Sequence, residues 1–164
     1  MSEIIKARVT AQTDEPFVVF MIGMRVNKPW KVHKWLPVAL AMARMIRELS
    51  MRENSDLLHF ESWGGRTSIM VQYWRSFDAL ERYAKSQSDE HLPAWKAFNQ
   101  KVASNGDVGI WHETYTVQPG EFECIYNNMP RFGLAAATRL VEVAGRRNQA
   151  RGRLAARPET TEVT

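Results

Sequence analysis

The chain has 164 residues, of which 45 % are hydrophobic and 24 % charged, so its length and composition are those of one folded domain with its own apolar core. The formal net charge of +4 gathers between residues 139 and 157, where the arginines lack the aromatic residues or recognition motif of a nucleic-acid-binding protein. The lone Cys124 excludes an internal disulfide and a cysteine metal cluster. The sequence also shows no signal-peptide core and no apolar run of membrane-spanning length, so we expect a cytoplasmic protein with neither nucleic acid nor membrane as a partner.

The first predicted elements are a buried strand and a long helix. Residues 17–24 form a continuous run of apolar, β-branched and aromatic residues, which is typical of a strand covered on both faces. Between Asn27 and Met51, apolar residues recur at near-helical spacing with charged residues opposite, which predicts an amphipathic helix. Pro37 fits either the first turn of this helix or a kink within it.

A β-hairpin and two further helices are predicted next. Residues 57–63 and 67–75 are strand-like, and Gly64-Gly65-Arg66 separates them with glycines that can adopt the positive φ of a tight turn. Ser76 begins a helix as its cap. Another helix begins near residues 88–91 and carries large apolar residues on one face.

Residues 108–117 predict one more strand, so the order is β-α-β-β-α-β. This order predicts an α+β, ferredoxin-like antiparallel sheet with helices on one face only. Beyond it we expect an extra strand within 122–130 and a short helix within 133–144. The predicted domains are residues 1–145, which hold the sheet and helices, and residues 146–164, a basic and flexible C-terminal tail.

The sheet face turned away from the helices needs a cover. Alternation divides the hairpin strands into two faces, and one face is expected to combine His59, Glu61 and Trp63 with Gln72 and Trp74. Large aromatic residues mixed with His, Glu and Gln are not typical of a solvent face, and left open they would form an apolar patch that monomers rarely tolerate. We therefore expect a homodimer that packs two such faces together and leaves a cavity for a hydrophobic small molecule in each half.

Four segments resemble one known family. They are Trp63-Gly64-Gly65, residues 89–98 (DEHLPAWKAF), residues 108–115 (VGIWHETY) and residues 123–130 (ECIYNNMP). With the element order, they resemble the monooxygenase-like family of the dimeric α/β-barrel superfamily, the fumagillin-biosynthesis monooxygenase type. The resemblance implies a dimeric α/β barrel for the 1–145 domain. The superfamily also contains cofactor-free quinone-forming monooxygenases, haem-degrading enzymes, haem peroxidases and aldoxime dehydratases, so the resemblance implies a fold more firmly than a reaction.

Three residues are candidates for catalysis. His112 and Glu113 are neighbours in a strand, so their side chains point to opposite faces and only one of them can face the barrel. If that residue is His112, its imidazole can act as a base on a phenolic substrate or as an axial haem ligand; the alternative is a hydrogen-bonded structural histidine. His59 and Glu61 stand on one strand face, a spacing that suits a carboxylate-oriented base and equally a solvated edge pair.

Seven residues are candidates for substrate binding: Trp63, Gln72, Trp74, His91, Trp95, Tyr126 and Asn128. His91 and Trp95 lie four residues apart on one predicted helix face, where they can close the barrel over an aromatic ligand or simply pack the helix. Tyr126 and Asn128 can orient a substrate through a hydroxyl and an amide, although Asn at the end of a strand is also a common turn residue. The scattered histidines have no metal-ligand spacing, so no metal site is predicted.

Three functions fit these features. The first is a monooxygenase-like enzyme that oxidises a hydrophobic or aromatic small molecule without a tightly bound organic cofactor, in which a histidine deprotonates the substrate and the electron-rich substrate reacts with oxygen. The second is haem chemistry, with His112, His59 or His91 as the axial ligand. The third is a small-molecule-binding module without catalysis. The sequence contains no glycine-rich phosphate loop, nucleophile elbow or dinucleotide fingerprint, which disfavours NAD, flavin and nucleotide chemistry.

Overall fold

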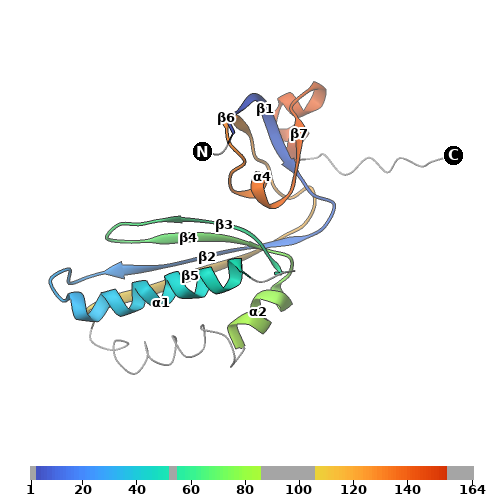
Figure 1. Ribbon diagram of the computed structural model, residues 1–164. Coiled ribbons are helices and arrows are strands. Elements are labelled where there is room, and N and C mark those ends of the chain that lie inside the picture. The colour runs from blue at the N-terminus through green and yellow to red at the C-terminus, as the bar shows by residue number, and fades with distance from the viewer. Residues whose placement is uncertain (1–2, 52–54, 86–105, 155–164) are drawn as a thin grey trace.

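The computed structural model describes residues 3–51, 55–85 and 106–154. Three layers stack in it: a small β-sheet, a larger β-sheet and a layer of helices (Figure 1). The elements in chain order are β1 (Ile5–Gln12), β2 (Phe17–Val26), α1 (Val32–Ser50), β3 (Leu57–Trp63), β4 (Ile69–Trp74), α2 (Phe77–Lys85), β5 (Val108–Val117), β6 (Tyr126–Met129), α4 (Leu134–Ala137), β7 (Arg139–Glu142), the 3₁₀ helix η1 (Gly145–Asn148) and α5 (Ala150–Leu154).

The larger sheet has the strand order β3-β4-β2-β5, and each pair of neighbours is antiparallel. With α1 between β2 and β3 and with α2 after β4, this is the predicted ferredoxin-like arrangement, so the α+β fold class is confirmed. The strands predicted from the runs at 17–24 and 108–117 correspond to β2 and β5. The other helix predicted between β4 and β5, near residues 88–91, lies outside the described residues.

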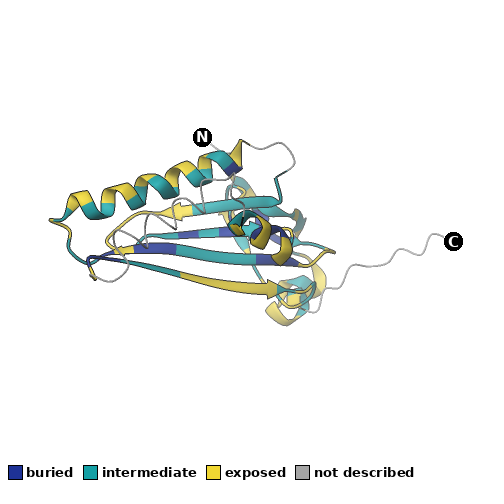
Figure 2. Ribbon diagram, turned by 90° about the horizontal axis from the view of Figure 1, so that it is seen from below, coloured by how far each residue is buried: buried dark blue, intermediate teal, exposed yellow. Residues whose placement is uncertain are grey.

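The helix layer covers one face of the larger sheet and contributes most of the core. Val18 and Trp74 are each 2 % exposed and pack against Leu49 of α1 and Leu80 of α2. A second cluster lies beneath the start of α1 and joins Met24, Val26 and Val108 to Trp35, Val38, Ala39, Met42 and Ile110. Pro37 lies inside α1, beyond its first turn. Figure 2 shows buried positions along the sheet, whereas much of the outer surface of α1 is exposed.

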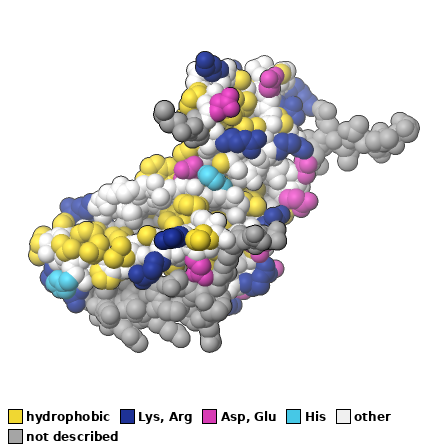
Figure 3. All heavy atoms as spheres, in the orientation of Figure 1, with side chains coloured by type: hydrophobic (Ala, Val, Ile, Leu, Met, Phe, Trp, Pro, Cys, Tyr) yellow, Lys and Arg dark blue, Asp and Glu magenta, His cyan; other side chains and the backbone are white. Residues whose placement is uncertain are grey.

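The small sheet has the order β6-β1-β7 and stands over one end of the other face (Figures 1 and 3). We call β1, β6, α4 and β7, together with the loop of residues 118–125 that leads into β6, the cap. Its core joins Phe17 to Leu134, and the Phe17 ring lies 5.3 Å from the ring of Phe122. The cap therefore shields part of the face that the sequence analysis expected a second copy to cover.

The cap also corrects two sequence expectations. The short helix expected within 133–144 is present but covers only Leu134–Ala137, because Arg139–Glu142 pairs with β1 as a strand. The helix stops at Thr138, whose hydroxyl donates to the carbonyl of Leu134 at 2.8 Å while its backbone is already extended. The extra strand expected within 122–130 is present but short, because β6 comprises only Tyr126–Met129.

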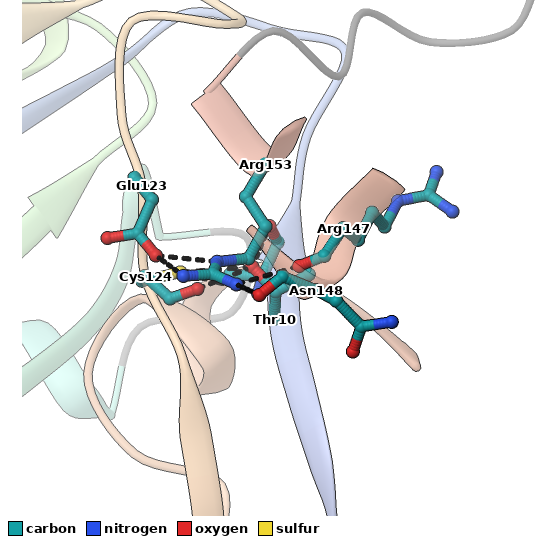
Figure 4. A network of polar contacts seen from close by, with 7 residues as sticks. Thr10, Glu123, Cys124, Arg147, Asn148 and Arg153 are labelled. Atoms are coloured by element: carbon teal, nitrogen blue, oxygen red, sulfur yellow. Dashed lines mark hydrogen bonds and ion pairs between the residues drawn. The ribbon is translucent and has the colours of Figure 1, made fainter. Parts of the chain in front are cut away.

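The segment after residue 145 is held against the cap by Arg153 (Figure 4). The Arg153 side chain is 8 % exposed and forms an ion pair with Glu123. Its guanidinium also donates to the carbonyl oxygens of Arg147 at 2.7 Å and Asn148 at 3.2 Å. Part of the expected flexible tail is thus folded as η1 and α5, while residues 155–164 lie outside the described residues. None of the helices in the described ranges has the length and apolar content to cross a bilayer.

Candidate functional site

The register of the β3–β4 hairpin decides which candidate residues share a face. His59 pairs with Tyr73, and Trp63 pairs with Ile69. Residues that pair directly in antiparallel strands point to the same side, and from His59 to Trp63 the register pairs odd-numbered residues of β3 with odd-numbered residues of β4. The expectation that His59, Glu61 and Trp63 share a face with Gln72 and Trp74 is therefore wrong. We call the face of His59, turned away from the helices, the open face.

Gln72 and Trp74 belong to the helix-covered face. Trp74 packs under α1 and α2, and its indole Nε1 donates to Oε1 of Gln72 at 2.8 Å. Gln72 is 7 % exposed, and its amide nitrogen lies 3.2 Å from Sδ of Met70. Both polar groups are satisfied inside the core, so neither residue lines the open face.

His112 also faces the helix layer. It pairs with Ile22 of β2, and its ring lies 5.8 Å from the ring of Phe20, which packs against the core beneath α1. Glu113, its neighbour, points to the open face and accepts a hydrogen bond from the hydroxyl of Tyr115 at 2.7 Å. The expected opposition of His112 and Glu113 is confirmed, and the carboxylate is the member on the open face.

His59 and Glu61 meet on the open face. The pleat of β3 places the two side chains on one side, and Nε2 of His59 lies 2.9 Å from Oε1 of Glu61. The side chains are 29 % and 25 % exposed, so the pair is half-buried and can be reached from solvent. If Nε2 carries the hydrogen shared with the carboxylate, Nδ1 is the ring nitrogen that can accept a proton. The arrangement is that of an imidazole base oriented by a carboxylate.

The cap contributes a backbone donor to this pair. The N–H of Gly133 donates to Oε1 of Glu61 at 3.4 Å, a long hydrogen bond to the same oxygen that contacts His59. Gly133 has a φ of 55°, a value that glycine adopts without strain. A Cβ atom at this position would lie 3.2 Å from the hydroxyl oxygen of Tyr73 and 3.7 Å from that of Tyr126. Glycine therefore allows the cap to approach the sheet closely beside the pair.

Two tyrosine hydroxyls flank Gly133. Tyr73 of β4 accepts a backbone hydrogen bond from Leu134, and Tyr126 of β6 accepts one from the N–H of Ala135 at 3.3 Å. Burial raises the pKa of Tyr73, and the nearby Cys124 and Glu61 raise it further. Burial likewise raises the pKa of Tyr126 far above its usual range. Both phenols are therefore neutral at physiological pH, and each accepts a backbone hydrogen bond from the start of α4.

Trp63 supplies an aromatic wall beside the pair. Its side chain is 44 % exposed, and its ring lies 6.1 Å from the ring of Phe132 in an edge-to-face arrangement. Phe132 precedes Gly133, so the wall joins the edge of the sheet to the cap. Phe132, Gly133 and Tyr73 were not among the site residues predicted from the sequence. Of these three residues, only Tyr73 could have been found from the sequence. Once a register for the β3–β4 hairpin is assumed, Tyr73 lies directly opposite His59.

The remaining candidates fall in three places. His91 and Trp95 lie outside the described residues. Tyr126 packs in the cap core, next to Tyr73. Asn128 is exposed and has a φ of 54°, which agrees with the alternative role as a turn residue at the end of a strand. Within residues 3–51, 55–85 and 106–154, no three His, Cys, Asp or Glu side chains are grouped as metal ligands would be.

Known proteins resemble this chain in sequence and in fold. The profile of the Monooxygenase af470-like family matches residues 17–134. The curated relative Monooxygenase af470 from Aspergillus fumigatus is 26 % identical over 149 residues, which cover 78 % of this chain and 53 % of the relative. This chain therefore spans about half the length of that relative.

Two solved structures are similar in fold. A crystal structure of aldoxime dehydratase is 15 % identical, with a TM-score of 0.54, and the match covers 71 % of this chain and 38 % of that chain. SnoaB from Streptomyces nogalater, a cofactor-independent oxygenase, is 14 % identical with a TM-score of 0.44, over 62 % of this chain and 93 % of that chain. At such identity the likeness shows the fold alone. The family profile, by contrast, spans from the first residue of β2 to the first residue of α4, and the chain belongs to the Monooxygenase af470-like family.

Proposed function

We propose that this protein is a monooxygenase-like enzyme that oxidises an electron-rich hydrophobic or aromatic small molecule on the open face. His59 is the general base and Glu61 is the carboxylate that orients it. The contact of 2.9 Å between Nε2 of His59 and Oε1 of Glu61 carries this proposal. The donation from Gly133 holds Glu61 in turn, so the imidazole has a defined orientation before a substrate arrives.

The proposed reaction begins with proton transfer. Nδ1 of His59 removes a proton from an acidic O–H or C–H of the substrate and leaves an electron-rich anion. That anion supplies the electrons that reduce dioxygen. In the overall reaction a substrate CH₂ group becomes a carbonyl, one oxygen atom enters the product and the other leaves as water. Trp63 supplies an aromatic surface on which a flat substrate can stack beside the base.

We propose that no tightly bound organic cofactor takes part, because the substrate itself supplies the electrons. Haem is the alternative, and the same pair of residues favours it as the second candidate. A metal-binding histidine usually donates its other ring nitrogen to a carboxylate, and Glu61 is placed to accept from His59 in that way. The absorption spectrum of the protein, purified with and without added haemin, distinguishes the two. A Soret band that is lost in His59→Gln would favour the haem enzyme.

We also propose that a second copy of the chain covers the part of the open face that the cap leaves uncovered. Trp63 of β3 and Tyr115 of β5 are 44 % and 50 % exposed there. Val71 of β4 and Met21 of β2 pair with each other on the two strands between them. Such a homodimer encloses the pair in a barrel and excludes water from the substrate. The mass in solution tests it, and Val71→Glu is expected to convert the dimer to a monomer.

The two histidines form a matched test of the proposed base. We would measure oxygen uptake by the purified protein with a panel of polycyclic phenols, and compare His59→Gln with His112→Gln. Loss of a general base is expected to lower kcat/KM by roughly 10²–10⁴ in His59→Gln. His112→Gln is expected to retain nearly full activity, because His112 faces the helix layer. If His112→Gln lost activity and His59→Gln kept it, the base would be His112 on the helix-covered face. Ligand binding without turnover in the unmodified protein would favour a binding module.

A further inference from the structure

An exposed apolar stripe runs along the beginning of α1. Trp30 is 74 % exposed, Val32 46 %, Leu36 40 % and Leu40 50 %. The last three are four residues apart and therefore lie along one side of the helix, and Trp30 stands in the turn just before it. Figure 3 shows hydrophobic side chains gathered at this end of the molecule, far from the cap. We call these four residues the α1 stripe.

The α1 stripe is not the side of the helix that packs in the core. Trp35, Val38 and Met42 make that contact with the larger sheet. The turn before the helix is also held in place, because Nε1 of Trp35 donates to the carbonyl of Pro29 at 3.0 Å. Folding therefore does not require the stripe to be apolar, and Trp30 is presented to solvent from a fixed turn.

Positive charges surround the α1 stripe. They are Lys28, Lys31 and Lys34 in the same segment and Arg66 in the β3–β4 loop, whose Nε donates to the carbonyl of Val26 at 3.3 Å. Residues 25–40 contain no Asp or Glu. Asp107 forms ion pairs with Lys28 at 2.8 Å and Lys31 at 2.9 Å, so one carboxylate is shared by two ammonium groups. This end of the molecule keeps a net positive charge.

We propose that the α1 stripe and these cations dock the protein on an anionic lipid surface. Trp30, Leu36 and Leu40 would enter the boundary between headgroups and acyl chains, and the lysines would lie against lipid phosphates. Exposed tryptophan beside lysine and apolar residues along one side of a helix suit a bilayer interface. A single exposed side of a helix with cations beside it suits a flat lipid surface. The helix layer lies on the other side of the sheet from the open face, so lipid binding does not depend on the proposed function.

Vesicle sedimentation tests the proposal with the intact protein. We expect sedimentation with phosphatidylcholine vesicles that contain phosphatidylglycerol, little with phosphatidylcholine alone, and weaker binding as salt is added. Trp30→Ala is expected to weaken binding about tenfold, since it removes the most exposed interfacial side chain. Phe77→Ala is the matched control, because Phe77 is an aromatic residue 47 % exposed at the start of α2 and outside the stripe.

Three results would overturn the proposal. They are no sedimentation with the anionic vesicles, equal sedimentation with both kinds of vesicle, and equal weakening by Trp30→Ala and Phe77→Ala. The mass of the Trp30→Ala variant in solution supplies a second measurement. If that variant lost an oligomeric state that the unmodified protein has, the stripe would belong to a contact between copies of the chain and not to a lipid surface.

Discussion

The two covers of the larger sheet differ in what holds them. The helix layer rests on large apolar side chains, of which Trp74 and Val18 are almost completely buried. The cap has a smaller apolar core and relies on polar contacts to the sheet and to its own neighbours, such as the Gly133 donation to Glu61 and the Arg153 ion pair with Glu123.

Because of this difference, the helix-covered face supplies most of the stability, and the open face carries the residues proposed for chemistry. Polar groups on the helix-covered face, such as those of Gln72 and Trp74, satisfy one another inside the core. On the open face, His59 and Glu61 remain half-exposed at the border of the cap, where a substrate can reach them. A half-covered face can keep an oriented base that a fully packed face would bury.

The largest expected change in the free energy of unfolding comes from a comparison of Trp74, on the helix-covered face, with Trp63, on the open face. Trp74→Ala is expected to lower the free energy of unfolding by about 3–5 kcal/mol, because it leaves a cavity between the sheet and the helices. Trp63→Ala removes a side chain that is 44 % exposed and is expected to cost about 1 kcal/mol. Urea denaturation measures both. Equal losses would contradict the assignment of stability to the helix-covered face.

Gly133→Ala tests how closely the cap approaches the sheet. It is expected to cost about 1–3 kcal/mol, because the backbone has a positive φ and a Cβ would crowd the Tyr73 hydroxyl. Gly145→Ala is the matched control, with a φ of 53° and open space around the added carbon, and about 1 kcal/mol is expected there. Thermal unfolding of the two variants gives the comparison. If Gly145→Ala were the more damaging, the close approach at Gly133 would not be needed.

Arg153 tests the polar attachment of the cap. Arg153→Ala removes a guanidinium that is 8 % exposed and is expected to lower the free energy of unfolding by about 1–3 kcal/mol. Arg82→Ala breaks the exposed ion pair with Asp56 and is expected to cost about 0–1 kcal/mol. Chemical denaturation with both variants measures the difference, and an equal cost would mean that the Arg153 contacts do not secure the cap.

The smallest expected effect is on the pH dependence of stability. It comes from the ion pairs of Asp107 with Lys28 and Lys31, which attach the segment before α1 to the sheet. Hydrogen bonds from Lys28 and Lys31 lower the pKa of the Asp107 carboxyl in the folded protein. The unfolded carboxyl titrates near its ordinary pKa of about 3.9, so the stability that Asp107 contributes is present above that pH and is lost as the pH falls through the lower folded value. Asp107→Asn is expected to flatten the decline of stability in acid, as measured by urea denaturation at a series of pH values. An unchanged decline would contradict the lysine attachment.

The ferredoxin-like sheet was predictable because its strands have strong local patterns. The continuous apolar run in β2 and the β-branched and aromatic run in β5 each indicate a strand without knowledge of its partner. The cap was missed for the opposite reason. Residues 5–12 do alternate between apolar and polar side chains, but β1 pairs only with β6 and β7, which lie far along the chain. A four-residue strand such as β7 has too few residues for a pattern to distinguish it from a helix.

The candidate site was predictable in part. Spacing alone placed His59 and Glu61 on one face, and the structure brings them into contact. Spacing also separates His112 from Glu113, but alternation does not say which face the helices cover. Gln72 and Trp74 were misplaced because the faces of two strands can be matched only when their register is known. Gly133 depends on the position of the cap, which no local pattern determines.

The pairing of β1 with β6 and β7 has a consequence for the order of assembly during synthesis. β1 leaves the ribosome before every other described strand, and its partners leave last. The nascent chain therefore carries β1 as an unpaired edge while the larger sheet is being made, a state that favours contact with chaperones. The cap, and with it the hydrogen bond from Gly133 to Glu61, forms only when translation has passed Glu142. The pair on the open face is thus completed only after the larger sheet has been synthesised, long after its two residues have been joined to the chain.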